Sequence, residues 1–404
     1  MTPFTIPPFL IDPTFLPAPL MTSEPGSFAQ RTVAERIPGI VDDTIAHNHF
    51  TDQTLRAVLA LRQEITSGVI RPIEEPGEDR DFWNELSHPY IGRSWLDVPW
   101  YWAETFFYRR MLEATGYFRA GPSYGVDPYA EKKETEFESG AALRAVAEVL
   151  HDATDLLPEE EQFRRLLYAT LWGNRVDLSY NVAAALGRSS AEEEQANLLV
   201  DDTAGIWRFL TTRPARRLML IADNAGTELC LDLVLCDWLL EHRLVEEITL
   251  HVKAQPLFVS DAMERDVLRG LDALARPGGP ALAPASRLEK ALADGTLAVA
   301  THWFYATSLF YFQMPGDLAA QVASANLVLL KGDANYRRLL GDAHWPFTTR
   351  FARVVDYFPA PLVALRTLKA EEIVGLEPGR AEQERAADAD WLVNGKRGVV
   401  QARL

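Results

Sequence analysis

The chain has 404 residues, of which 48% are hydrophobic and 24% are charged, so it is long enough for two structural units and has the composition of a folded protein. Its formal net charge of −17 repels nucleic-acid phosphates and anionic lipids, which excludes nucleic acid and membranes as expected partners. A phosphorylated ligand would need a bound metal ion or a few well-placed Lys and Arg side chains.

The N-terminal half predicts an extended arm followed by helices. Residues 1–30 are rich in proline and lack a basic start, which favours an arm over a signal peptide. Residues 31–190 form the predicted helical region, because apolar residues recur three and four positions apart over Thr54–Thr66, Trp100–Thr115 and 140–156. No apolar run reaches the roughly 18 residues that a membrane-spanning helix needs.

Residues 191–404 show a different pattern, in which short apolar runs end in polar residues and helical segments follow. This alternation predicts an α/β domain built on a mostly parallel sheet. The polar residues that follow the four main runs are Asp223, Asp261, Asp333 and Arg366–Lys369. Because ligands bind outside the carboxyl ends of parallel strands, we expect these residues to converge.

Two cysteines, Cys230 and Cys236, lie six residues apart on a predicted helix over Thr227–His242. On a helix they would face different sides, so neither a disulfide nor a metal clip is expected. A reducing cytoplasm is the expected location.

Oxygen-bearing side chains after two of the runs form a candidate metal site. Asp223 and Asn224 precede the predicted helix, and Asp261 closes the next apolar run. Carboxylate and amide oxygens suit hard divalent cations and would leave positions open for water and phosphate. The alternative interpretation is that each of these residues only caps the helix that follows it.

The third and fourth runs indicate phosphate binding. Gly332 lies at a strand-to-helix turn, where backbone N–H groups and the helix dipole can hold an anion. Arg337 can add a forked contact to phosphate, and Arg366 and Lys369 supply two cations. The alternative is that Asp333 caps a helix while the arginines and Lys369 are merely solvated.

These motifs, in this order, resemble the damage-control phosphatase family, and specifically its acidic-residue methyltransferase-like subgroup, which has an Arg-Thr-x-Lys motif near the C-terminus. The resemblance extends into the helical half. The segments that carry it are Asp223–Gly226, Phe258–Asp261, Lys331–Arg337, Arg366–Lys369, Trp100–Tyr101 with Glu104, Tyr108–Arg109, and Leu171–Asn174 with Asp177.

The resemblance implies a three-layer α/β/α domain with an N-terminal helical region, and a divalent-metal phosphatase acting on sugar phosphates such as fructose 1-phosphate or fructose 6-phosphate. Mn²⁺ is the first expected metal, with Co²⁺, Ni²⁺ or Mg²⁺ as alternatives. Matched motif by motif, the implied metal ligands are Asp223, Asn224 and Asp261, which with Lys369 form the implied catalytic set. The implied substrate contacts are Asp223, Asn224, Asp333, Ala334, Asn335, Tyr336, Arg337 and Lys369.

Two other functions remain open. One is an S-adenosylmethionine-dependent protein-glutamate O-methyltransferase, although no Gly-x-Gly-x-x-Gly loop follows the first predicted strand to hold that cofactor. The other is a regulator that binds a sugar phosphate without consuming it. Direct attack by water and initial attack by a carboxylate such as Asp261 or Asp333 are both compatible with the sequence, which carries no signal for the oligomeric state.

Overall fold

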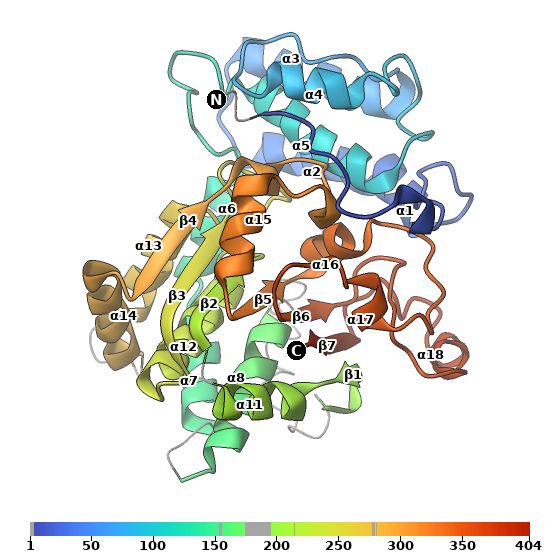
Figure 1. Ribbon diagram of the computed structural model, residues 1–404. Coiled ribbons are helices and arrows are strands. Elements are labelled where there is room, and N and C mark those ends of the chain that lie inside the picture. Colours follow the sequence, from blue (N-terminus) through green and yellow to red (C-terminus); the bar gives the residue numbers. More distant parts are fainter. Residues whose placement is uncertain (1–3, 153–155, 174–194, 214, 277–278, 280) are drawn as a thin grey trace.

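The computed structural model describes residues 4–152, 156–173, 195–213, 215–276, 279 and 281–404, and a seven-stranded sheet lies at its centre (Figure 1). The strand order is β1-β7-β6-β5-β2-β3-β4, and neighbours are parallel except for the antiparallel pair β6 and β7. The strands are β1 Leu198–Asp201, β2 Ala215–Ile221, β3 Val245–Val252, β4 Leu297–Thr301, β5 Leu327–Lys331, β6 Leu362–Thr367 and β7 Gly398–Arg403.

Helices cover both faces of this sheet. Alternation along β2 shows the two layers, because Leu218 and Leu220 pack on one face and Met219 and Ile221 on the other. One layer consists of α7 Ala141–Asp152, α8 Glu159–Trp172, α11 Thr203–Thr212, α12 Thr227–Glu241, α13 Glu264–Leu274 and α14 Leu282–Asp294. The other contains α15 Gly316–Ser324, α16 Asp333–Leu340 and α17 Phe351–Val354. The predicted three-layer α/β/α fold with a mostly parallel sheet is confirmed.

A helical cap sits above this sheet in Figure 1. Its apolar side chains share one continuous core with α15 and α16, so the cap is packed onto the second layer and is not a detached unit. The cap consists of α2 Ile37–Ala46, α3 Asp52–Ser67, α4 Arg80–Ser87 and α5 Trp100–Thr115. The short α1 Phe28–Arg31 and α18 Arg380–Ala387 also lie outside the two layers, whereas α6 Ala130–Glu138 packs through Phe137 into the core of the first layer. The predicted boundary near residue 190 lies outside the described residues.

Helix α5 is the centre of the cap, and nearly all of its side chains are buried. A helix that is apolar on most of its circumference must be enclosed by other elements, and α3 packs directly against it. The helix ends at Gly116, whose φ of 78° is the left-handed conformation that terminates helices. Among the described helices, none is long and apolar enough to cross a membrane.

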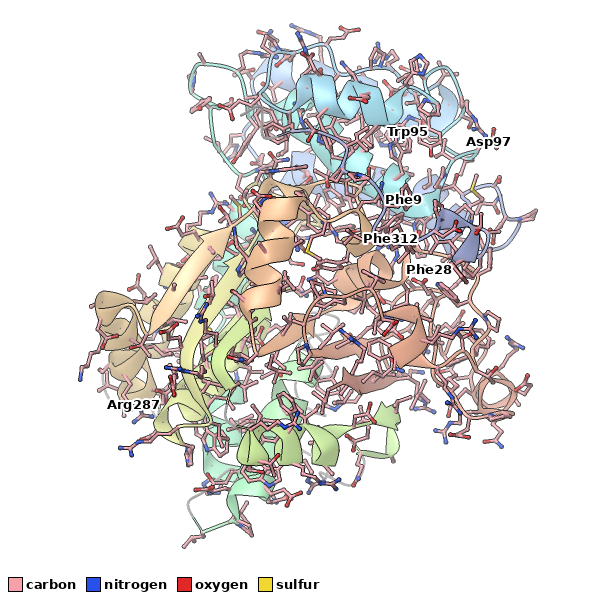
Figure 2. The ribbon with its side chains drawn as sticks, in the orientation of Figure 1. Phe9, Phe28, Trp95, Asp97, Arg287 and Phe312 are labelled. Atoms are coloured by element: carbon pink, nitrogen blue, oxygen red, sulfur yellow. The ribbon has the colours of Figure 1, made fainter. Side chains whose placement is uncertain are left out.

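The N-terminal arm ties the cap to the sheet layers. Figure 2 shows Phe9 beside Phe312, and the two rings stack with centroids 5.5 Å apart. Farther along, short antiparallel bridges join Pro19 to Ala343 and Met21 to Pro99. The arm therefore contacts the loop after α16 and the start of α5 within a few residues.

Candidate active site

The carboxyl end of β2 carries the first pair of predicted site residues. Asp223 is buried, and Asn224 donates from Nδ2 to Asp223 Oδ2 at 2.8 Å and to Glu228 Oε2 at 2.8 Å. The start of α12 is capped from elsewhere, because the N–H of Thr227 donates to Glu136 Oε1 at 2.7 Å. Helix capping therefore does not explain the pair.

Asp261 reaches the same place by a different route from the one predicted. It lies in the loop well beyond β3, where an isolated antiparallel bridge pairs it with Asn224, and Ser260 Oγ donates to Asn224 Oδ1 at 2.6 Å. The loop turns through Phe258 and Val259, whose φ angles of 47° and 65° lie in the left-handed region. That region is costly for a β-branched residue, so this turn stores strain beside the site.

Two lysines hold the Asp261 loop in place. Lys253 Nζ lies 3.2 Å from Asp261 Oδ2, while Lys133 Nζ donates to the Asp261 main-chain oxygen at 2.7 Å and to Asp266 Oδ2 at 3.0 Å. Asp266 also accepts the N–H of Met263 at 2.8 Å, so Asp266 caps α13 and Asp261 does not. The Asp261 carboxylate is thus free of a capping role and faces a cation.

The electrostatics of the two carboxyls follow from their burial. Burial, reinforced by the negative charges of Glu228 and Asp261, raises the pKa of Asp223 well above its usual value, while Lys253 and Lys369 oppose the shift. Burial also raises the pKa of Asp261, again against the effect of Lys253. Two buried carboxyls that repel each other favour a bound proton or a bound cation between them.

Gly332 brings the start of α16 against Asp223. Its φ is 89°, and a Cβ atom there would lie 2.1 Å from both Cγ and Oδ2 of Asp223, so only glycine fits. The next residue, Asp333, accepts at Oδ1 from Arg366 Nε at 2.7 Å and from the N–H of Lys369 at 3.0 Å. The motifs after β2, β5 and β6 therefore meet, as the sequence predicts.

The side chains of Asn335 and Tyr336 on α16 are buried in the interior. Asn335 Nδ2 donates to the main-chain oxygens of Ala222 at 3.2 Å and Lys331 at 2.8 Å. The hydroxyl of Tyr336 donates to Gln401 Oε1 at 2.7 Å. Their predicted contacts with substrate stay predictions, and the N–H of Tyr336 already donates to the main-chain oxygen of Gly332 at 3.1 Å.

Arg337 is also engaged within the protein. Its guanidinium lies 3.7 Å from the ring centroid of Trp100, donates to Asp342 Oδ1 at 2.7 Å and donates to Glu104 Oε2 at 2.5 Å. These contacts join α16 to α5 of the cap. The neighbouring Ala334 is half-buried and completes the first turn of the helix.

A buried charge network lies behind the site. Lys331 Nζ donates to Glu228 Oε1 at 2.9 Å, to Asp232 Oδ1 at 2.7 Å and to the main-chain oxygen of Thr170 at 2.7 Å. Because Glu228 also accepts from Asn224, the network fixes the amide that separates the two carboxyls. Lys331 therefore connects β5, α8 and α12 beneath the candidate site.

Sequence reasoning missed three of the charged residues that support the site. Lys253 follows β3, and the rule that selected Asp223 would also have found it; Glu228 lies one helical turn after Asn224. Lys133 comes from α6 and has no local signal. Asn174 and Asp177, which the resemblance included, lie outside the described residues.

The described residues include no group of three or more His, Cys, Asp or Glu side chains placed to hold a metal ion. The predicted set of Asp223, Asn224 and Asp261 contains two such side chains and an amide. These side chains are oxygen donors on two loops joined by a bridge, which is compatible with a hard cation.

Comparison with known proteins shows which proteins the chain resembles. Residues 32–384 match the damage-control phosphatase ARMT1-like domain. Damage-control phosphatase ARMT1 of Mus musculus is 32% identical over 95% of this chain and 98% of its own length, and that of Homo sapiens is 32% identical over 96% and 98%.

A solved structure shows the same fold at much lower identity. The crystal structure of a DUF89 family protein from Pyrococcus horikoshii aligns with a TM-score of 0.51 and 15% identity, over 93% of this chain and 98% of that chain. The likeness to these ARMT1 proteins covers 95–96% of the chain, and the family match over residues 32–384 includes the positions of every motif described above. The chain belongs to the ARMT1-like damage-control phosphatase family.

Proposed function

We propose that this protein is a divalent-metal-dependent phosphatase that hydrolyses phosphate monoesters of small sugar phosphates, with fructose 1-phosphate and fructose 6-phosphate as first candidates. Family membership supports a phosphatase of metabolite damage control. One observation carries the finer proposal: buried Asp223 lies against Gly332, just before α16, and Asp261 is bridged to the adjacent Asn224, near enough for its charge to raise the pKa of Asp223.

The proposed metal ligands are Asp223, Asn224 and Asp261. Burial raises the pKa values of both carboxyls, and the negative charges of Glu228 and Asp261 raise that of Asp223 further, so a divalent cation would relieve this repulsion as well as bind carboxylate oxygens. We expect Mn²⁺ first, with Co²⁺, Ni²⁺ and Mg²⁺ as alternatives. When bound, such an ion would supply Lewis-acid stabilisation of the charge on the phosphoryl group.

The chain's own residues would bind and orient the phosphate. The first turn of α16 presents N–H groups that have no acceptor within the helix, next to Asp223, which suits the oxygens of a phosphate. Asp333 fixes the main chain of Lys369, and we assign the Lys369 ammonium to charge neutralisation in the transition state. Arg337 would act as a positioning residue, because Asp342 and Glu104 hold it.

We place this activity in the cytoplasm, with a small phosphorylated metabolite as the partner and neither nucleic acid nor membrane involved. The charge of −17 and the two free, buried cysteines of α12 support that setting.

The test is phosphate release from a panel of sugar phosphates with each metal and with a chelator, comparing wild type with Asp261→Asn and Lys369→Met. We expect release only with metal, and a loss of about 100-fold or more in each variant. Glu289→Gln and Lys290→Met make the same charge changes on exposed positions of α14 and should keep full activity. Binding of fructose 1-phosphate without turnover under every condition would instead favour the regulator.

A further inference from the structure

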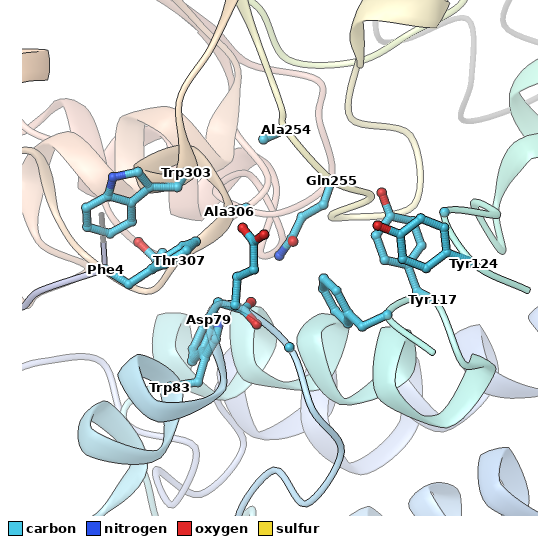
Figure 3. A pocket seen from close by; sticks show the side chains of 14 residues that line it. Phe4, Asp79, Trp83, Tyr117, Tyr124, Ala254, Gln255, Trp303, Ala306 and Thr307 are labelled. Carbon is cyan, nitrogen blue, oxygen red and sulfur yellow. The ribbon is translucent and has the colours of Figure 1, made fainter. Parts of the chain in front are cut away.

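A cavity apart from the candidate active site lies between the cap and the loops that follow β3 and β4. Its volume is about 610 Å³, and Figure 3 shows Trp303 and Trp83 on one side, Tyr117 and Tyr124 on the other, and Gln255 between them. The lining residues are Phe4, Gly77, Glu78, Asp79, Trp83, Tyr117, Phe118, Tyr124, Gly125, Ala254, Gln255, Trp303, Ala306 and Thr307. None of the predicted site residues belongs to it.

The lining has a distinctive composition. Six of its side chains are aromatic, two are carboxylates, and neither Lys nor Arg is among them. Asp79 is paired with the buried Arg109, which donates from Nε at 2.8 Å and from Nη2 at 2.8 Å. Glu78 is exposed, and within the described residues no ion pair to it is found, so its negative charge is available to a ligand.

We propose that this cavity binds a small organic cation, either a quaternary ammonium group or a protonated amine. The faces of aromatic rings are electronegative and attract cations, and a carboxylate at the rim adds long-range attraction. A phosphate or another anion has no cationic partner there, because the lining includes neither Lys nor Arg. The guanidinium of Arg109 stacks on Phe118 at 4.1 Å, but the bidentate contact with Asp79 compensates its charge.

The cation cavity borders the candidate active site without merging with it. Ala254 follows Lys253, whose ammonium group is paired with Asp261, and Ala306 follows Tyr305. Lys253 Nζ lies 6.0 Å from the centroid of the Tyr305 ring, and neither of these residues lines the cavity. The proposal therefore does not depend on phosphatase activity, and either one can fail alone.

Calorimetric titration of the full chain with choline tests the proposal. The matched ligand is the uncharged isostere of choline, in which a carbon atom replaces the quaternary nitrogen. We expect choline to bind about tenfold more tightly than the isostere, which corresponds to about 1.4 kcal/mol. Equal affinity of the two ligands, or no binding of choline, would overturn the proposal.

Variants locate the binding within the cavity. Glu78→Gln removes the available carboxylate at an exposed position and should weaken choline binding several-fold, and Trp303→Leu should weaken it further. Glu85→Gln neutralises an exposed carboxylate of α4 outside the cavity and should leave binding unchanged. Unchanged binding in both Glu78→Gln and Trp303→Leu, or displacement of choline by fructose or inorganic phosphate, would show that the cavity is not a cation site.

Discussion

Replacing Gly332 with alanine adds a methyl group where the structure has no room for one. The new Cβ would lie 2.1 Å from Cγ of Asp223, whereas non-bonded carbon atoms sit about 3.5–4.0 Å apart. The carboxyl or the turn must therefore move by about 1.5 Å. The backbone adds to this, because φ 89° with ψ 168° is a region that only glycine adopts readily, and other residues lose about 1–3 kcal/mol there.

We expect Gly332→Ala to lower the free energy of unfolding by about 1–3 kcal/mol and the rate of phosphate release by about 100-fold, since a 1 Å displacement of a reacting group typically costs that much. Urea unfolding and phosphate release from fructose 1-phosphate measure the two effects. Gly295→Ala is the matched control, because Gly295 has φ 84° with no atom within 4 Å of a built Cβ. Equal loss of activity in both variants would refute the role assigned to the contact with Asp223.

Three further predictions use other parts of the molecule. Burial lowers the pKa of His251 to about 4 from 6.5, so between about pH 6.5 and about pH 4 it is mainly the unfolded chain that gains the proton. His251 should therefore contribute a loss of about 2 kcal/mol of stability to wild type between about pH 7 and about pH 5. His251→Gln should lack this loss in urea unfolding, and coincident profiles of the two proteins would contradict the assignment. Lys331→Met leaves Glu228 and Asp232 buried without their cation and should lower the free energy of unfolding by about 3–5 kcal/mol. The control, Lys290→Met at an exposed position, should lower it by about 0.5 kcal/mol or less. Similar urea midpoints for the two variants would argue against a structural role for the buried charge network. Added Mn²⁺ should raise the unfolding temperature of wild type and not that of Asp261→Asn, and equal shifts would place the metal elsewhere.

Much of the fold was predictable because its elements carry strong local signals. The predicted helix over Trp100–Thr115 matches α5 at both ends, where Pro99 precedes the first turn and Gly116 takes the left-handed conformation that stops it. The strands β1, β4 and β7 escaped prediction. They lie at or near the edges of the sheet, and β7 runs antiparallel to β6, a pairing that depends on packing between separate segments and not on a local pattern.

The candidate site was predictable where residues directly follow parallel strands, and unpredictable where a loop conformation positions the residue. Asp223 and Asp333 follow buried parallel strands directly, so the sheet alone brings them together. Asp261 depends on a turn through left-handed Phe258 and Val259, which neither residue type indicates. The cation cavity is lined by five separate segments of the chain, and no local pattern in any one of them predicts it.

The contacts of the N-terminal arm determine when folding can be completed during synthesis of the chain. Glu24 on the arm contacts His344 at 2.7 Å, although the two are 320 residues apart in sequence. At a synthesis rate of about 5–20 residues per second, the arm leaves the ribosome tens of seconds before its partners exist. The apolar side chains of the cap, which share their core with α15 and α16, also stay without these partners until residues 316–340 have been made. Folding of the first half therefore requires segments from the last third of the chain. Until those segments are made, aromatic residues of the cap remain exposed and can aggregate.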